Sequence, residues 1–167
     1  MSKSGKEHFL ASYDREHATT MRVLRAYPPD QLDLRPHEKC KTARELAWIF
    51  VLERGLGRTV FNNEFGTRPP SGAPPAPPEL WDDLLSALEQ AHKDFGDLVR
   101  STPDEELSQN IKFFTAPKTM GDIPRMTWLW FLLNDQIHHR GQFSIYLRMA
   151  GGKVPSIYGP TADEPWM

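Results

Sequence analysis

Four segments of this chain repeat apolar residues at alternating steps of three and four, a spacing that places side chains on one face of an α-helix. The segments extend from about Glu7 to Ala26, Thr42 to Asn62, Pro78 to Arg100 and Pro124 to Ala150. No clear strand pattern lies between them. The chain is therefore predicted to form one all-α domain over residues 1–167, a four-helix bundle whose side chains interlock along a shared core.

Local signals mark the ends of these helices. Pro28 stops the first helix, because a proline ring cannot continue a helix interior. Thr42, followed three residues later by Glu45, matches a capping box at the start of the second helix. Gly151 follows the last helix, where glycine commonly ends a helix. These signals support the four helices as separate elements.

Two long connections and a tail complete the chain. Residues 67–78 contain six prolines among twelve residues, which predicts a long, stiff connection between the second and third helices. Residues 102–123 form the other connection, in which Phe113 and Phe114 are expected to anchor the chain on the bundle. Residues 153–167 are too rich in turn residues for a helix, yet their aromatic side chains predict an ordered C-terminal tail.

Composition excludes several classes of protein. The chain carries 20 Lys and Arg against 22 Asp and Glu, so nucleic acid is not expected as a partner. The longest apolar run, Trp128 to Leu133, has six residues and is too short to cross a membrane. The first ten residues have no apolar signal-peptide core. Because Cys40 is the one cysteine, no internal disulfide can form, and a cytoplasmic location is expected.

Polar residues interrupt the apolar stripes of three helices. The inward stripe of the last helix reads Trp128, Leu132, Asp135, His139, Gln142 and Tyr146. Glu53 interrupts the stripe of the second helix, and His17 interrupts that of the first. Burying an unpaired polar group costs about 1–3 kcal/mol in mutational data. We therefore expect these acid and imidazole groups to meet inside the bundle.

A metal site is one reason for such a meeting. Asp135 and His139 are four residues apart, so their side chains lie one above the other on the same helix face. Glu53 could supply a third ligand from the facing helix. A mixed carboxylate and imidazole set suits zinc, nickel, iron or manganese. Three protein ligands would leave open positions for a substrate, as a catalytic metal requires.

Structural explanations compete with this hypothesis. Asp135 and His139 can pair with each other, or with Arg140 or Arg54, in an ordinary polar network. His17 can be a satisfied histidine at the edge of the core. Cys40 lies between two lysines that would favour its thiolate, but no spacing places a histidine beside it.

The last helix also carries a recognisable motif. His138-His139-Arg140-Gly141-Gln142 is followed by Tyr146-Leu147-Arg148, a glycine and Val154-Pro155. This stretch resembles the C-terminal signature of the DinB-like (YfiT-like) four-helix metal-binding superfamily, and residues 43–48 resemble the start of its second helix. The resemblance covers the whole chain in helix order, and its specific part is the C-terminal stretch.

The resemblance implies a metal-dependent bundle, often dimeric, whose better-understood relatives transfer low-molecular-weight thiols or act on related small molecules. It also implies three histidine ligands at positions that fall on Ile49, Asp135 and His139, of which the last alone is a histidine. Glu53, one turn beyond Ile49, could replace the missing ligand. Alternatively, the site has lost its metal while the fold persisted. A set with two oxygen ligands would prefer harder ions than three histidines would.

Two functions follow from these observations. The first is a metal-dependent small-molecule enzyme, a thiol transferase or hydrolase, with Gln142, Tyr146 and Tyr158 as substrate-binding residues. In it, Gln142 and Tyr146 orient the substrate or the ligand histidine, and Tyr158 shapes the mouth of the pocket. The alternative is a metal-free protein that binds a ligand or acts as a dimer without catalysis. The exposed part of Trp128 to Phe131 could form a homodimer contact between helices, and a buried core explains the same run equally well.

Overall fold

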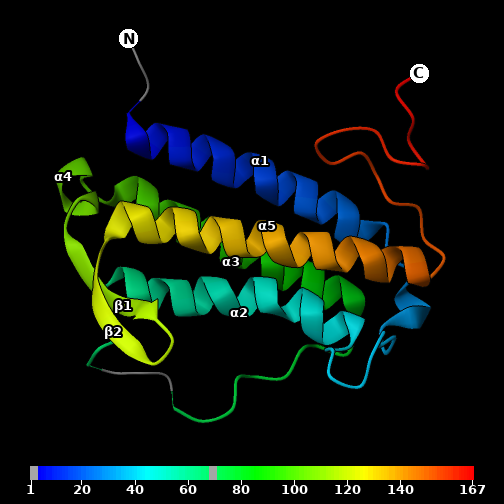
Figure 1. Ribbon diagram of the computed structural model, residues 1–167, viewed down its shortest axis with the longest axis horizontal. Helices are drawn as coiled ribbons and strands as arrows, with labels where there is room; N and C mark the ends of the chain where they lie inside the picture. The colour runs from blue at the N-terminus through cyan, green and yellow to red at the C-terminus, as the bar shows by residue number, and fades with distance from the viewer. Residues whose placement is uncertain (1–3, 68–70) are drawn as a thin grey trace.

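Four long helices lie side by side in a computed structural model of the chain (Figure 1). The structure describes residues 4–67 and 71–167. The helices are α1 (Gly5–Arg25), α2 (Ala43–Phe61), α3 (Trp81–Ser101) and α5 (Arg125–Met149). Each lies within three residues of its predicted limits, and the predicted helical bundle is confirmed.

The order of the helices around the bundle decides which faces can share a site. Helix α5 packs against α1 on one side and α2 on the other, while α3 also contacts both α1 and α2. Helices α1 and α5 run in one direction, and α2 and α3 run in the opposite one (Figure 1). Side chains of α5 can therefore meet residues of α1 or α2, depending on where they lie around its axis.

Capping and glycine explain how α2 begins and how closely it packs. Thr42 accepts a hydrogen bond from the Glu45 backbone N–H, and the Glu45 carboxylate accepts one from the Thr42 N–H, which confirms the capping box. Further along, a Cβ atom at Gly57 would lie 3.2 Å from a methyl carbon of Leu132. Glycine therefore lets α2 approach α5 closely.

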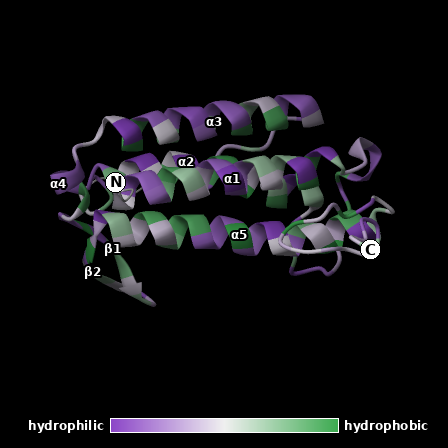
Figure 2. Cartoon of the chain, turned by 90° about the horizontal axis from the view of Figure 1, so that it is seen from above, coloured by the Kyte–Doolittle hydropathy of each residue, from purple (hydrophilic) through white to green (hydrophobic). Residues whose placement is uncertain are grey.

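The hydrophobic core is divided into two clusters along the bundle. One contains Leu24, Phe50 and Phe143, and the other contains Phe95 and Trp128. Between them lie the buried polar side chains of four residues: Glu16, Arg54, Gln136 and Arg140. Figure 2 shows the same division along α5, where a hydrophobic first half gives way to a hydrophilic middle. This polar layer crosses the bundle near its centre.

The connection between α3 and α5 contains regular structure that the sequence pattern did not predict. A short helix α4 (Asp104–Leu107) precedes an antiparallel hairpin of β1 (Asn110–Ala116) and β2 (Thr119–Pro124). Its turn contains Lys118 at a positive φ of 59° instead of a typical Asn-Gly pair, so the usual hairpin signal is missing. Phe113 packs beside Trp128, with ring centroids 5.9 Å apart, and anchors the hairpin on α5.

Smaller elements close the other end of the molecule. A single 3-10 turn, η1 (Pro29–Gln31), follows α1. The C-terminal tail is ordered, because Trp166 donates a hydrogen bond to Ser156 and Thr161 donates one to the carbonyl oxygen of Val154. In the described part of the chain, none of the helices has the length and apolar character that a membrane crossing needs.

Candidate metal centre between α2 and α5

Three side chains predicted as metal ligands come together between α2 and α5. Nε2 of His139 lies 3.2 Å from Oε1 of Glu53 and 3.9 Å from Oδ1 of Asp135. One donor atom from each residue lies within 4.8 Å of the others. Among the described residues, this group has a composition and spacing that could hold a metal ion.

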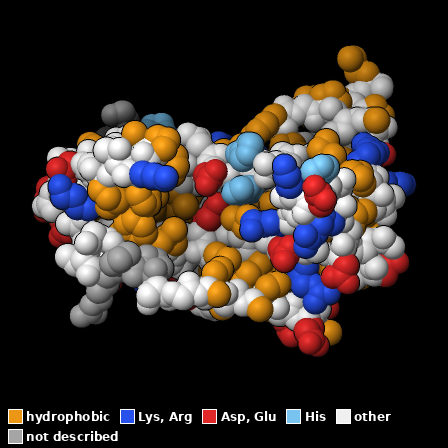
Figure 3. All heavy atoms as spheres, turned by 60° about the horizontal axis from the view of Figure 1, so that its bottom comes forward, with side chains coloured by type: hydrophobic (Ala, Val, Ile, Leu, Met, Phe, Trp, Pro, Cys, Tyr) orange, Lys and Arg blue, Asp and Glu red, His pale blue; other side chains and the backbone are white. Residues whose placement is uncertain are grey.

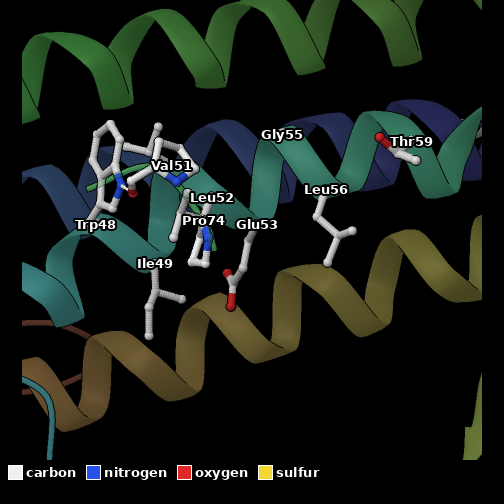
Figure 4. Close-up of a pocket in the computed structure, with 10 residues that line it drawn as sticks. Trp48, Ile49, Val51, Leu52, Glu53, Gly55, Leu56, Thr59 and Pro74 are labelled. Atoms are coloured by element: carbon white, nitrogen blue, oxygen red, sulfur yellow. Dashed lines mark hydrogen bonds between the residues drawn. The ribbon is translucent and has the colours of Figure 1, made fainter. Parts of the chain in front are cut away.

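The helices position these residues by simple geometry. Asp135 and His139 are one turn apart on α5, as their spacing predicted. In Figure 4, Ile49, Glu53 and Leu56 all point from α2 toward α5. Glu53 therefore faces His139 across the helix interface, while Ile49 fills the position one turn earlier.

A hydrogen bond from Gln142 fixes the orientation of the histidine ring. Nδ1 of His139 donates to Oε1 of Gln142 at 2.9 Å. The amide group of Gln142 donates in turn to Nε2 of His138 at 3.0 Å. With its Nδ1 proton engaged, neutral His139 carries a lone pair on Nε2, the atom that faces both carboxylates.

Burial and pairing change the proton affinity of this group. Burial raises the pKa of the Glu53 carboxyl, and the contact with His139 opposes that shift. The hydrogen bond to Glu53 raises the pKa of His139 to about 9, more than burial lowers it. At neutral pH, His139 of the metal-free protein therefore carries a proton on Nε2, the ring nitrogen that faces Glu53.

The second oxygen of Glu53 is the best indication that the group suits a cation. Oε2 of Glu53 is buried and has no hydrogen-bond partner among the described residues. An unpaired buried carboxylate oxygen is costly, and a cation bound beside it would remove that cost. The donor set, with two carboxylates and one correctly oriented imidazole, fits a divalent metal.

Two cavities flank the cluster. The first, of about 570 Å³, lies between α2 and the prolines Pro74 and Pro75, and Glu53 lines it together with Trp48 and Leu52 (Figure 4). The indole N–H of Trp48 donates to the carbonyl oxygen of Pro75 at 2.8 Å, which attaches these prolines to α2. We refer to this space as the apolar cavity, because Glu53 is its one charged lining residue in the described chain.

The second cavity, of about 470 Å³, opens on the other side of the cluster. His139 and Gln142 line it from α5, and Lys39 and Lys41 line it from the loop before α2. We call it the basic cavity. Figure 3 shows acidic and histidine side chains meeting near the middle of this face, with Lys and Arg on both sides of them. Ile49 lines both cavities, so they adjoin at the cluster.

The structure separates the other predicted substrate-binding residues. Tyr146 lines the basic cavity, and its hydroxyl donates to the carbonyl oxygen of Lys41 at 2.9 Å. Tyr158 lies on the α1 side of α5, where its hydroxyl donates to Glu16 and accepts from Arg140, both at 2.6 Å. The structure therefore brings Gln142 to the cluster and Tyr146 to the wall of the basic cavity, and it brings Tyr158 to neither.

His17 also lies away from the cluster, and its partner was missed by sequence reasoning. The His17 and His92 rings stack between α1 and α3, with centroids 3.7 Å apart and planes within 4°. Nδ1 of each ring is buried and has no hydrogen-bond partner among the described residues. Burial is the main reason that the pKa of each histidine falls to about 3. His92 lies at helical spacing from the buried Leu85, Leu88, Phe95 and Val99 of α3, so this spacing was a signal that placed the ring toward the interior.

Comparison with known proteins agrees with the fold. A family model described as the DinB family matches residues 1–166. The uncharacterized protein YrdA of Bacillus subtilis strain 168 is 28% identical over 159 residues, covering 95% of this chain and 90% of that protein.

Solved structures show the same architecture. The crystal structure of a DinB-like protein from Bacillus cereus ATCC 10987 has a TM-score of 0.72 and 24% identity, covering 90% of this chain and 95% of that one. A DinB-like protein from Bacillus subtilis, YjoA, has a TM-score of 0.70 and 14% identity, covering 90% and 97%.

Proposed function

Since the chain belongs to the DinB family, we propose that it is a metal-dependent enzyme acting on a small molecule, of the thiol-transferase or hydrolase type. Glu53, Asp135 and His139 are the ligands in this proposal. The observation that carries it is the convergence of three donor atoms within 4.8 Å at the junction of two cavities. Zinc, nickel, iron and manganese all suit such a donor set.

The chain's own residues supply binding and orientation. Gln142 holds the His139 ring so that Nε2 faces the carboxylates. Asp135 is more exposed than the other two ligands, at 44% of its side-chain surface, so a substrate can approach from its side. A divalent cation held there would act as a Lewis acid and lower the pKa of a thiol or water beside it.

Metal analysis of the purified protein tests the proposal. Chelator-treated wild type is loaded separately with zinc, nickel or manganese, and bound metal is measured after desalting. Near-stoichiometric metal is expected in wild type and not in His139→Ala. His8→Ala is the matched control, because it removes an exposed histidine of α1 that takes no part in the cluster. Equal metal content in wild type and His139→Ala, or none in either, would rule out this site.

A metal-free binding protein is the second candidate. Ile49 favours it, because this side chain has no donor atom and lines both cavities. The 3.2 Å contact between Glu53 and His139 would then be a structural ion pair. In this case wild type takes up no metal, and His139→Ala lowers the free energy of unfolding without changing metal content.

A further inference from the structure

The two cavities on either side of the candidate metal centre differ in chemical character. The apolar cavity is formed by side chains of α2 and by prolines, and of its lining residues only Glu53 is charged in the described chain. Its volume of about 570 Å³ is in the range of small-molecule sites. It therefore suits an aliphatic or aromatic group.

The basic cavity suits an anion. Lys39 and Lys41 line it, and the lining residues in the described chain include no carboxylate. Glu38 and Glu45 are the acidic residues near these lysines in the sequence, but neither lines the cavity, and the Glu45 carboxylate caps α2 through the Thr42 N–H at 2.7 Å and contacts Arg35 at 3.4 Å. An anionic group entering this cavity would thus meet two lysine side chains and, among the described residues, no lining carboxylate.

The order of these features along the surface limits the shape of a ligand. Glu53 lines the apolar cavity and His139 lines the basic cavity, while the two side chains contact each other at 3.2 Å. A molecule occupying both cavities passes Ile49, which lines both, and its middle part then lies beside Glu53 and His139. The part of the molecule that lies over Glu53 and His139 is then the linkage between its apolar end and its acidic end.

From this arrangement we propose that the substrate is an amphipathic anion, in which an apolar group is joined to an acidic group through the bond that reacts at the cluster. This inference rests on the proposed function, because it places the reacting bond beside the same three ligands. The apolar end lies against Leu52 and Trp48, and the acidic end lies near Lys39 and Lys41.

Three related compounds test separately how each end of such a ligand contributes to binding. N-octanoylglycine carries both ends, N-octanoylglycinamide lacks the negative charge, and N-acetylglycine lacks the apolar chain. Their affinities are measured by calorimetry with metal-free protein, so that a carboxylate cannot be attracted to a metal. N-octanoylglycine is expected to bind at least about tenfold more tightly than N-acetylglycine, because each buried methylene adds affinity.

Variants locate each end. Replacing both lysines, in Lys39→Gln/Lys41→Gln, should lower the affinity for N-octanoylglycine by about threefold to tenfold. The affinity for N-octanoylglycinamide should not change. The matched control, Lys118→Gln/Lys153→Gln, changes the net charge equally at two exposed lysines outside both cavities. Leu52→Gln should lower the affinity for both octanoyl compounds. This variant should fold normally, because Leu52 belongs to neither core cluster.

The outcomes for the ligand and for the metal are independent. If wild type binds metal but all three compounds bind equally or not at all, the substrate class is wrong and the proposed metal centre stands. If the compounds show the expected order but no metal is bound, the amphipathic site stands and the proposed enzyme fails. Equal losses in the Lys39→Gln/Lys41→Gln and Lys118→Gln/Lys153→Gln proteins would overturn the assignment of the acidic end.

Discussion

Nε2 of His139 lies 3.2 Å from Oε1 of Glu53, and this contact joins α5 to α2 at the candidate metal centre. The bond to Glu53 raises the pKa of His139 to about 9, so a proton occupies the Nε2 position at neutral pH. A cation that binds there has to displace this proton.

Metal affinity should therefore rise with pH. Between pH 6 and the His139 pKa of about 9, each pH unit should strengthen binding by up to about tenfold, because one proton is released per metal. Calorimetry in buffers of different ionisation enthalpy counts the released protons directly. Asp135→Asn keeps His139 and Glu53 and should still release a proton. Affinity that is independent of pH over this range would show that the cation does not bind at Nε2.

Gln142 should control metal affinity without binding metal itself. Gln142→Leu removes the acceptor for the His139 Nδ1 proton, so the ring can rotate and its tautomer is no longer fixed. Loss of such an orienting partner typically costs about tenfold to a hundredfold in metal affinity. Competition with a chromogenic chelator measures the change, and Gln142→Glu, which restores an acceptor oxygen, should recover most of it. An unchanged affinity in Gln142→Leu would remove this residue from the site.

Two glycines in α2 should respond oppositely to alanine. Gly55→Ala should stabilise the fold by about 0.5–1 kcal/mol, since no atom lies within 4 Å of its added Cβ and alanine favours the helix. Gly57→Ala should destabilise it by about 1–3 kcal/mol, because the added Cβ meets Leu132 at 3.2 Å and Phe95 at 3.3 Å. Urea denaturation compares the two variants. Equal stability would mean that α2 and α5 are packed less tightly than the structure shows.

The stacked pair of His17 and His92 should make the fold sensitive to acid. The pKa of each falls to about 3 in the folded protein, below the ordinary value of 6.5, so the unfolded chain binds protons first as the pH decreases. Stability is therefore lost between about pH 6.5 and pH 3. His17→Phe keeps an aromatic ring against His92 and removes one titrating group, so its free energy of unfolding should depend less on pH.

Denaturation at several pH values tests this expectation. His8→Phe is the control, because it removes an exposed histidine from the same helix. If His17→Phe and wild type lose stability in parallel between pH 7 and pH 4, the stacked pair does not cause acid sensitivity.

Much of the bundle and its cluster could be predicted from local pattern. Helix limits follow from capping residues such as Thr42 and from prolines, because these act within a few residues of the chain. The pairing of Asp135 with His139 follows from the fixed rotation per residue in a helix. Glu53 could be predicted as a third ligand, because the apolar stripe of α2 that contains it had to face the same bundle interior.

Other features needed the tertiary structure, because they join segments that are distant in sequence. The hairpin of β1 and β2 forms without a typical turn signal and is anchored where Phe113 meets Trp128. The contacts of Tyr158 with Glu16 and Arg140 depend on the path of the tail across α1. The two cavities depend on where Pro74 and Pro75 and the loop before α2 lie against the helices.

The sequence by itself determined the helices, their inward faces and the three candidate ligands, since periodicity and capping are local properties of a chain. Only the tertiary structure decided that Glu53 and His139 meet in contact, that His17 stacks on His92, and that an apolar and a basic cavity adjoin the cluster. Those relationships depend on the rotation and spacing of neighbouring helices. Packing of the whole core sets that geometry, and no single segment encodes it.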